Sequence, residues 1–289
     1  MSARGPSPRP GAATPRLIAV DLDGTLLDPL GVPHAHDVAA LRRAQDQGVL
    51  VTILTGRLYS GTRAAAEAIG LPGPVGCVDG SHIVDASSHR TLHHHAFRGD
   101  AAVKLRDAVA PTGAALFVLA DDKVIHDAAG LPYVDYVSIW SLVTEATDEV
   151  ARHGAWEGAD GVTALVAVGG AGEIHDASIS IRAALGDVAQ VATFPTRRLD
   201  QRWGLVCRAS GGNKGSALRW ICDHHGIGVH EAVCVGDWLN DIPMFEVAGR
   251  SFAMAQAPDP VKELATDTLE AGTLAGGGVA EALAKAFGV

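Results

Sequence analysis

Three kinds of segment are missing from this 289-residue sequence. No apolar run reaches the length of about 18 residues that a membrane-spanning helix needs, so we expect no membrane span. Asn-x-Ser/Thr glycosylation acceptors are absent, and none of the four cysteines belongs to a Cys-x-x-Cys pair. Three of the cysteines lie in apolar segments, which is typical of buried, reduced thiols. We therefore expect a cytoplasmic protein.

The sequence also lacks an excess of basic residues. It has 23 Lys and Arg against 33 Asp and Glu, and its formal net charge is −10. Proteins that bind nucleic acid without sequence preference need a basic face, so we expect no nucleic-acid partner. A small anionic substrate remains compatible with this charge, because a bound cation can reverse the local field of a site.

The beginning of the chain differs in composition from the rest. Residues 1–15 are rich in Pro, Gly and Arg and contain no apolar stretch of the signal-peptide type. We expect them to form a disordered tail. Hydrophobic residues make up 47% of the whole sequence, and the remaining chain is long enough to bury a sizeable core.

Short apolar strands alternate with helical segments near both ends of the chain. The expected strands are 17–20, 49–54, 76–78, 232–235 and 252–254, and the main expected helices are 36–47, 60–69, 213–225, 244–248 and 278–287. Strands and helices that alternate through short links are typical of a doubly wound parallel sheet. The predicted fold class is therefore α/β, with a Rossmann-like core formed by residues 16–83 and 205–289.

The segment between these two pieces has a mixed pattern. Its expected strands are 83–85, 91–97, 114–119, 123–126, 162–168 and 188–194, and a last strand around 203–207 leads back to the core. Its expected helices are 100–110 and 171–185. The strands at 114–119 and 123–126 flank Asp121 and Asp122, which favours a hairpin. No parallel strand that ends in acidic residues occurs here. We expect residues 84–204 to form an inserted α+β domain.

Polar side chains follow the core strands, where ligands bind in open α/β sheets. Asp21 and Asp23 come directly after the first strand and should lie on the same side of the extended chain. Their charges repel unless a cation or a proton lies between them. Thr55 follows the second strand, and Lys214 begins a helix. The strand at 232–235 is followed by Asp237, Asn240 and Asp241.

These residue types suit the transfer of a phosphoryl group. Carboxylates beside a glycine-containing bend form an oxygen-rich site of the kind that Mg²⁺ prefers. Lys214 offers a positive charge at a helix start, and Thr55 offers a hydroxyl and backbone N–H groups, all of which favour phosphate. An Asp can accept the phosphoryl group, and a second Asp can move protons.

Four motifs occur in a fixed order along the two core pieces. They are Ile18–Leu27 (IAVDLDGTLL), Ile53–Arg57 (ILTGR), Lys214–Leu218 (KGSAL) and Gly236–Asp241 (GDWLND). Together they resemble the motifs of the haloacid dehalogenase superfamily, and more closely those of its Cof-type phosphatases, which belong to subclass IIB and carry a C2 cap. In the segment 84–204, only the position and length of the insertion resemble the cap of that family.

The resemblance implies a role for each acid. Asp21 is expected to be the nucleophile and a Mg²⁺ ligand. Asp23 is expected to be the general acid and base, with its backbone carbonyl as a further Mg²⁺ ligand. Asp237 is expected to bind Mg²⁺, and Asp241 to be a ligand or to support one.

The resemblance also implies which residues contact the phosphoryl group. Thr55, Gly56 and Lys214 are expected to hold it, with Gly56 presenting its N–H. Asn240 is expected either to contact phosphate or to hold Lys214 in place.

The sequence departs from the family pattern at two positions. In addition, a cluster of histidines has two possible interpretations. Asp79 stands where relatives often have Asn, and Trp238 stands where a small residue is common. His93 and His95 can share one face of a strand, either as metal ligands or as part of a solvated strand.

The function expected from these residues is Mg²⁺-dependent hydrolysis of a phosphomonoester through an aspartyl-phosphate. The partner is then a small phosphorylated metabolite, and a sugar phosphate is the first class to consider. Two alternatives use the same residues: a phosphomutase with the same nucleophile, and a non-catalytic protein that binds a phosphorylated metabolite. The oligomeric state remains open.

Overall fold

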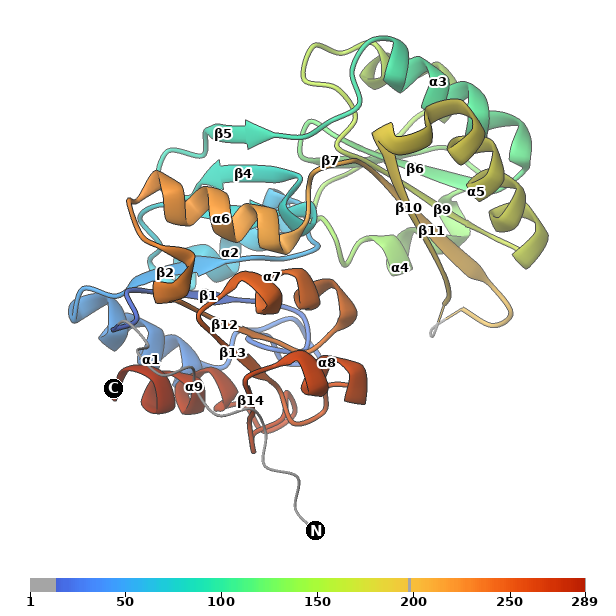
Figure 1. The fold of residues 1–289 in the computed structure, drawn as a ribbon. Coiled ribbons are helices and arrows are strands. Elements are labelled where there is room, and N and C mark those ends of the chain that lie inside the picture. Colours follow the sequence, from blue (N-terminus) through green and yellow to red (C-terminus); the bar gives the residue numbers. More distant parts are fainter. Residues whose placement is uncertain (1–13, 197–198, 289) are drawn as a thin grey trace. The chain divides into compact units, whose positions relative to one another are not determined.

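The computed structural model describes residues 14–196 and 199–288 (Figure 1). Most of the expected N-terminal tail lies outside these residues. The described chain divides into two compact units. One contains the residues up to Gly56, Arg63–Leu92 and those from Asn213 onward, and the other contains Arg57–Thr62 and His93–Gly212. The domain limits expected from the sequence, 16–83, 84–204 and 205–289, stay a prediction.

The core sheet of the first unit is parallel throughout. Within the described residues it has five strands, in the order β14-β13-β12-β1-β2 (Figure 1). The strands are β1 (Leu17–Val20), β2 (Leu50–Ile53), β12 (Ala232–Gly236), β13 (Arg250–Ala253) and β14 (Asp267–Thr268). The central position of β1 and β12 brings the residues that follow them to the same edge of the sheet.

Helices cover both faces of this sheet, which is why its central strands are continuously apolar. Leu17, Ala19 and Cys234 pack on one face against α6, α7 and α8. The alternate residues of the strands point to the other face, where α1 and α9 pack together (Figure 1). The helices are α1 (Ala35–Asp46), α6 (Lys214–His224), α7 (Ile242–Val247), α8 (Asp259–Leu264) and α9 (Gly278–Phe287). The predicted doubly wound parallel core is confirmed.

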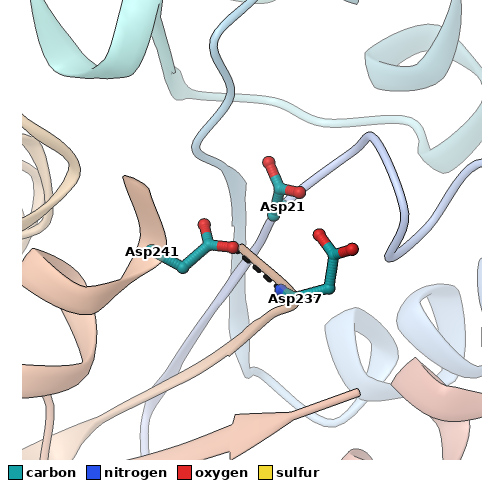
Figure 2. Close-up of side chains that lie close together, drawn as sticks. All are labelled: Asp21, Asp237 and Asp241. Atoms are coloured by element: carbon teal, nitrogen blue, oxygen red, sulfur yellow. Dashed lines mark hydrogen bonds between the residues drawn. The ribbon is translucent and has the colours of Figure 1, made fainter. Parts of the chain in front are cut away.

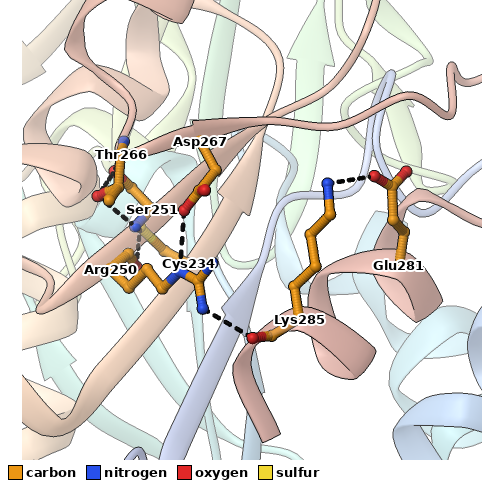
Figure 3. Close-up of polar contacts among 7 residues, drawn as sticks. All are labelled: Cys234, Arg250, Ser251, Thr266, Asp267, Glu281 and Lys285. Atoms are coloured by element: carbon orange, nitrogen blue, oxygen red, sulfur yellow. Dashed lines mark hydrogen bonds and ion pairs between the residues drawn. The ribbon is translucent and has the colours of Figure 1, made fainter. Parts of the chain in front are cut away.

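Polar side chains tie the edge of the sheet to α9 (Figure 3). Arg250 of β13 donates from Nε to Asp267 of β14 at 2.8 Å and from Nη1 to the carbonyl of Lys285 at 2.7 Å. Lys285 in turn pairs with Glu281 one helical turn earlier, at 2.6 Å. Arg250 thus holds the short strand β14 through Asp267. It also provides a hydrogen-bond donor for the carbonyl of Lys285, near the end of α9.

The strand expected at 76–78 does not extend the core sheet as predicted. β3 (Pro74–Cys77) forms a separate three-stranded sheet with β4 (His82–Asp85) and β5 (Thr91–His94). It contacts β2 through an isolated parallel bridge between Leu54 and Gly76 and through the hydroxyl of Thr52, which donates to the carbonyl of Pro74 at 2.8 Å. Pro74 has no N–H to donate, and β4 folds back antiparallel onto β3 through a tight turn.

The second unit is α+β, as the sequence predicts. Within the described residues its sheet has the order β10-β11-β9-β6-β7-β8, antiparallel except for the pair β7 and β8. Helices α3 and α5 pack together against it, over a core that contains Phe97 and Trp156. Helix α2 (Tyr59–Ile69) has its first residues in this unit.

The elements of this unit follow the expected segments closely. They are α3 (Asp100–Val109), β6 (Ala115–Ala120), β7 (Lys123–His126), α4 (Val134–Val137), β8 (Thr144–Ala146), β9 (Ala164–Gly169), α5 (Ala171–Leu185), β10 (Ala189–Pro195) and β11 (Trp203–Ala209). The hairpin of β6 and β7 is confirmed, with Asp121 and Asp122 at positive φ values of 50° and 59°. Only α4 and β8 were not expected, because both are too short to show a periodic pattern. None of the helices in the described ranges is long and apolar enough to cross a membrane.

Candidate active site

Asp21 is the first residue after β1 and lies at the end of the core sheet. Its backbone N–H donates to the carbonyl of Val235 in the neighbouring β12 at 3.0 Å, so the pairing of the two strands fixes its position. Its side chain is buried, with 4% of the residue surface exposed.

Lys214 is the first residue of α6 and is fully buried. Asn213 caps the helix, and its side chain accepts the N–H of Ser216 at 2.8 Å. The Nζ atom of Lys214 donates to Asp21 Oδ1 at 2.5 Å and to Asp241 Oδ1 at 2.6 Å. Lys214 therefore links the acid after β1 to an acid that follows β12.

Three carboxylates converge beside this lysine. Asp21, Asp237 and Asp241 each offer a ligand atom, and these atoms lie within 4.8 Å of one another (Figure 2). Asp241 Oδ2 accepts the N–H groups of Asp237 at 2.8 Å and of Trp238 at 2.9 Å, which fixes the loop after β12. Asp237 Oδ1 is buried and has no hydrogen-bond partner among the described residues. A buried carboxylate oxygen without a partner, next to two further carboxylates, fits a divalent cation such as Mg²⁺.

Asp21, Asp237 and Asp241 form an acidic cluster, in which Lys214 supplies the positive charge. Burial raises the pKa of Asp21 well above its usual range, Lys214 opposes this effect, and Asp241 adds to it. Burial and the charge of Asp241 raise the pKa of Asp237 to about 6. Burial alone would lower the pKa of Lys214, but the charges of Asp21 and Asp241 together raise it. A divalent cation would relieve the excess of negative charge.

Gly24 leaves the space that the Asp237 carboxylate occupies. A Cβ atom at this position would lie 2.2 Å from Asp237 Oδ2, and the φ angle of Gly24 is +82°. Only glycine fits both conditions. Asp23, the residue before it, is exposed and lies outside the group of three carboxylates.

Thr55 and Gly56 follow β2 as expected, and the turn after β3 lies beside them. Thr55 is buried, donates its N–H to the carbonyl of Gly76 at 2.9 Å and accepts the N–H of Asp79 at 2.8 Å. A Cβ atom on Gly56 would lie 3.4 Å from Asp79 Oδ1. Asp79 therefore lies next to the predicted phosphate-binding loop.

Asn240 contacts this same Asp79. Its Nδ2 atom donates to Asp79 Oδ1 at 2.7 Å, while the carboxylates that hold Lys214 are Asp21 and Asp241. Val78 and Asp79 have φ angles of 49° and 51°. A left-handed conformation is strained for the β-branched Val78, and such strain often accompanies functional sites. The sequence marks Asp79 as a departure from the family but does not reveal its partner.

Gln256 lies at the site although no sequence pattern indicated it. It stands in the loop after β13, and its Nε2 atom donates to the carbonyl of Gly24 at 2.6 Å and to Asp237 Oδ2 at 3.3 Å.

The histidine cluster contains a contacting pair. His93 and His95 share a face, and their Nε2 atoms lie 2.9 Å apart, while His94 contacts Thr163 at 2.9 Å. Within the described part of the chain, no third metal-ligating side chain joins this pair. The group of three carboxylates is accordingly the stronger candidate for a metal site.

The chain is similar to known proteins of one family. The family model of haloacid dehalogenase-like hydrolases matches residues 18–283. The pyridoxal phosphate phosphatase of Escherichia coli is 28% identical over 266 residues, which cover 86% of this chain and 91% of that protein. A 5-amino-6-(5-phospho-D-ribitylamino)uracil phosphatase of Bacillus subtilis is 26% identical over 269 residues, which cover 87% and 91%.

Solved structures show the same fold. A haloacid dehalogenase-like hydrolase from Bacteroides thetaiotaomicron superposes with a TM-score of 0.80 at 22% identity, covering 94% of this chain and 99% of that one. A sugar phosphatase of haloacid dehalogenase subclass IIB superposes with a TM-score of 0.73 at 18% identity, covering 94% and 99%. The chain therefore belongs to the haloacid dehalogenase-like hydrolase family.

Proposed function

We propose that this chain is a Mg²⁺-dependent phosphomonoester hydrolase that acts on a small organophosphate through an aspartyl-phosphate on Asp21. The observation that carries the proposal is the pairing of Lys214 with both Asp21 and Asp241, beside the unpartnered oxygen of Asp237. This arrangement joins a nucleophile, a cation for phosphate and an acidic cluster suited to a metal.

In the first step, Asp21 attacks phosphorus. Lys214 occupies its Oδ1, so Oδ2 is the oxygen that forms the new bond. The bond from phosphorus to the leaving oxygen breaks, its electron pair goes to that oxygen, and Asp23 donates a proton to it. The exposed position of Asp23 allows its carboxyl to reach a bound substrate.

In the second step, water attacks the phosphorus of the aspartyl-phosphate. Asp23 takes a proton from this water, the bond between phosphorus and Oδ2 breaks, and the Asp21 carboxylate is restored. Inorganic phosphate then leaves. The same two carboxylates serve both steps with their protonation reversed.

The remaining site residues hold the substrate and the metal. Thr55, Gly56, Lys214 and Asn240 would bind the phosphoryl oxygens, and Asp21, Asp237 and Asp241, with the backbone carbonyl of Asp23, would hold Mg²⁺. Bound Mg²⁺ supplies charge neutralisation for the phosphoryl group and for the clustered acids.

The substrate class is a small phosphorylated metabolite. The curated relatives act on pyridoxal phosphate and on a phosphorylated ribitylaminouracil, and one structural neighbour is a sugar phosphatase. A sugar phosphate is the first class to test, and the vitamin-related phosphates of the relatives come next.

Phosphate release across a panel of sugar, nucleotide and cofactor phosphates, with Mg²⁺ and with EDTA, tests this proposal. We expect Mg²⁺-dependent release from at least one small ester. Asp21→Asn should lower kcat by about 10³-fold or more, because the amide cannot act as the nucleophile, and it should retain the fold. Transfer of the phosphoryl group to a second sugar hydroxyl without free phosphate would favour the phosphomutase. Tight binding of an ester by the folded protein without turnover would contradict hydrolysis.

A further inference from the structure

Gln256 connects two loops that meet at the acidic cluster of Asp21, Asp237 and Asp241. Its Nε2 atom donates both to the carbonyl of Gly24, in the turn after β1, and to Asp237 Oδ2, in the loop after β12. The distances are 2.6 Å and 3.3 Å. One side-chain amide thus bridges the segments that carry Asp21 and Asp237.

The orientation of this amide is determined by a third contact. The backbone N–H of Thr273 donates to Gln256 Oε1 at 3.1 Å, so the oxygen end of the amide faces Thr273. The nitrogen end must then face Gly24 and Asp237, because a flipped amide would place two acceptors, or two donors, against each other.

Thr273 is itself held on two sides. Its Oγ1 donates to the carbonyl of Leu27 at 3.0 Å, and its carbonyl contacts His34 Nε2 at 2.7 Å. Both partners belong to the segment between β1 and α1. Thr273, which orients Gln256, is therefore anchored to the segment between β1 and α1. The same segment contains Gly24, whose carbonyl Gln256 binds.

These contacts restrict how the Asp237 carboxylate can turn. Gln256 binds Oδ2, and Gly24 lies so close to the same oxygen that a Cβ atom there would be 2.2 Å away. The other oxygen, Oδ1, is buried and has no partner among the described residues. The hydrogen bond from Gln256 thus leaves Oδ1 as the oxygen available to a cation.

We propose that Gln256 is a positioning residue for the metal ligand Asp237 and that it strengthens divalent-cation binding without contacting the cation. The proposal rests on the proposed function, since it takes the acidic cluster to be a Mg²⁺ site. Residues that orient a metal ligand commonly change metal affinity by about 10- to 100-fold when they are replaced. Gln256 is exposed, so its replacement should leave the fold intact.

The test is Mn²⁺ binding to the full chain, measured by calorimetry and by competition with Mg²⁺. Gln256→Met keeps the length of the side chain and removes its hydrogen bonds. We expect it to raise the Kd for Mn²⁺ about 10-fold or more while the metal-free Tm stays unchanged. Gln45→Met is the matched control, because Gln45 of α1 also donates its amide to a backbone carbonyl, that of Gly70 at 3.4 Å, but lies outside the site. It should bind Mn²⁺ as the unmodified chain does.

Activity gives a second measurement. With the best substrate of the panel, Gln256→Met should need more Mg²⁺ for half-maximal rate and should recover most of kcat at saturating Mg²⁺. Asp237→Asn, which removes the ligand itself, should stay impaired at saturating Mg²⁺.

Two results separate failure of this inference from failure of the proposed function. Unchanged Mn²⁺ affinity in Gln256→Met, together with loss of binding in Asp237→Asn, would overturn the role of Gln256 and leave the metal site standing. Absence of Mn²⁺ binding in the unmodified chain would overturn the metal site and this inference together.

Discussion

Lys214 is the residue that balances the negative charges of the site. It is a fully buried cation between two buried carboxylates, and Asp237 lies beside them. Removing one member of a buried ion pair leaves the other charges without compensation. We therefore expect the stability of the chain and its proposed function to depend on the same side chain.

We predict that Lys214→Met lowers the free energy of unfolding of the metal-free protein by about 3 kcal/mol at pH 7. Urea denaturation in EDTA measures this change. Lys104→Met, which replaces an exposed lysine of α3, is the control and should change stability by no more than about 0.5 kcal/mol. Equal effects of the two substitutions would show that Lys214 does not compensate the buried acids.

The raised pKa of Asp237 predicts a particular pH dependence of stability. Because its pKa is about 6 in the folded chain, against the 3.8 of an ordinary Asp in the unfolded chain, the folded state keeps a proton that the unfolded state loses between these pH values. The stabilising contribution is complete below about pH 3.8 and disappears as the pH rises through about 6. In EDTA, Asp237→Asn should therefore gain stability relative to the unmodified chain as the pH rises from 4 to 7. A constant difference in unfolding free energy across this range would contradict the assignment.

Single residues also show how far the sequence could predict the site. The rule that parallel strands end at one edge brings Asp21 together with Asp237 and Asp241, because β1 and β12 are neighbours. Contacts made by loop side chains follow no such rule. Gln256 reaches the site from the loop after β13, and Asp79 reaches Asn240 through a strained turn, so neither contact could be predicted.

Helices α1 and α9 are joined by a buried side chain. Asp37 of α1 has no exposed surface, and its two oxygens accept the N–H groups of Gly277 at 2.9 Å and Ala280 at 2.8 Å. It therefore satisfies the otherwise unpaired donors at the start of α9.

Replacing Asp37 with Ala should lower the free energy of unfolding by about 2 kcal/mol, because two buried N–H groups lose their acceptor. Asp37→Asn keeps one acceptor oxygen and should cost less. Chemical denaturation of both variants gives the comparison. If Asp37→Ala were as stable as the unmodified chain, the cap would contribute nothing to the packing of α9.

At the scale of elements, periodicity predicts most of the fold. β1 and α5 have the expected bounds, because a short apolar run and a long amphipathic segment are both clear patterns. Pairing between strands is less predictable. β3 is a strand where one was expected. It pairs with β4 because the turn after β3 reverses the chain, and this turn has no simple sequence pattern.

The four cysteines of the chain are distributed over both compact units. Cys77, Cys207, Cys222 and Cys234 are all buried. Burial raises the pKa of Cys207 to about 12 and that of Cys222 to about 11, and it raises the pKa of Cys234 well above its usual range. Thiolate, the reactive form, is therefore scarce in the native protein.

We predict that a thiol reagent modifies none of the four cysteines rapidly in the native protein and modifies all four in denaturant. Raising the pH from 7 to 9 should accelerate the native reaction much less than that of a small free thiol. Peptide mapping of the labelled protein identifies each site. Fast native labelling of Cys207 alone would show that the second unit opens more readily than its buried core suggests.

The central claim for the whole molecule is that Asp21 carries the phosphoryl group during turnover. The most direct test is mass spectrometry of enzyme quenched in acid during turnover of p-nitrophenyl phosphate, whose leaving group needs no proton from Asp23. It compares the unmodified chain with Asp23→Asn, which should form the intermediate but hydrolyse it slowly. The account predicts one added phosphoryl group on the peptide that contains Asp21, more of it in Asp23→Asn and none in Asp21→Asn. Rapid turnover without a phosphorylated peptide, or a phosphoryl group on any other residue, would contradict it.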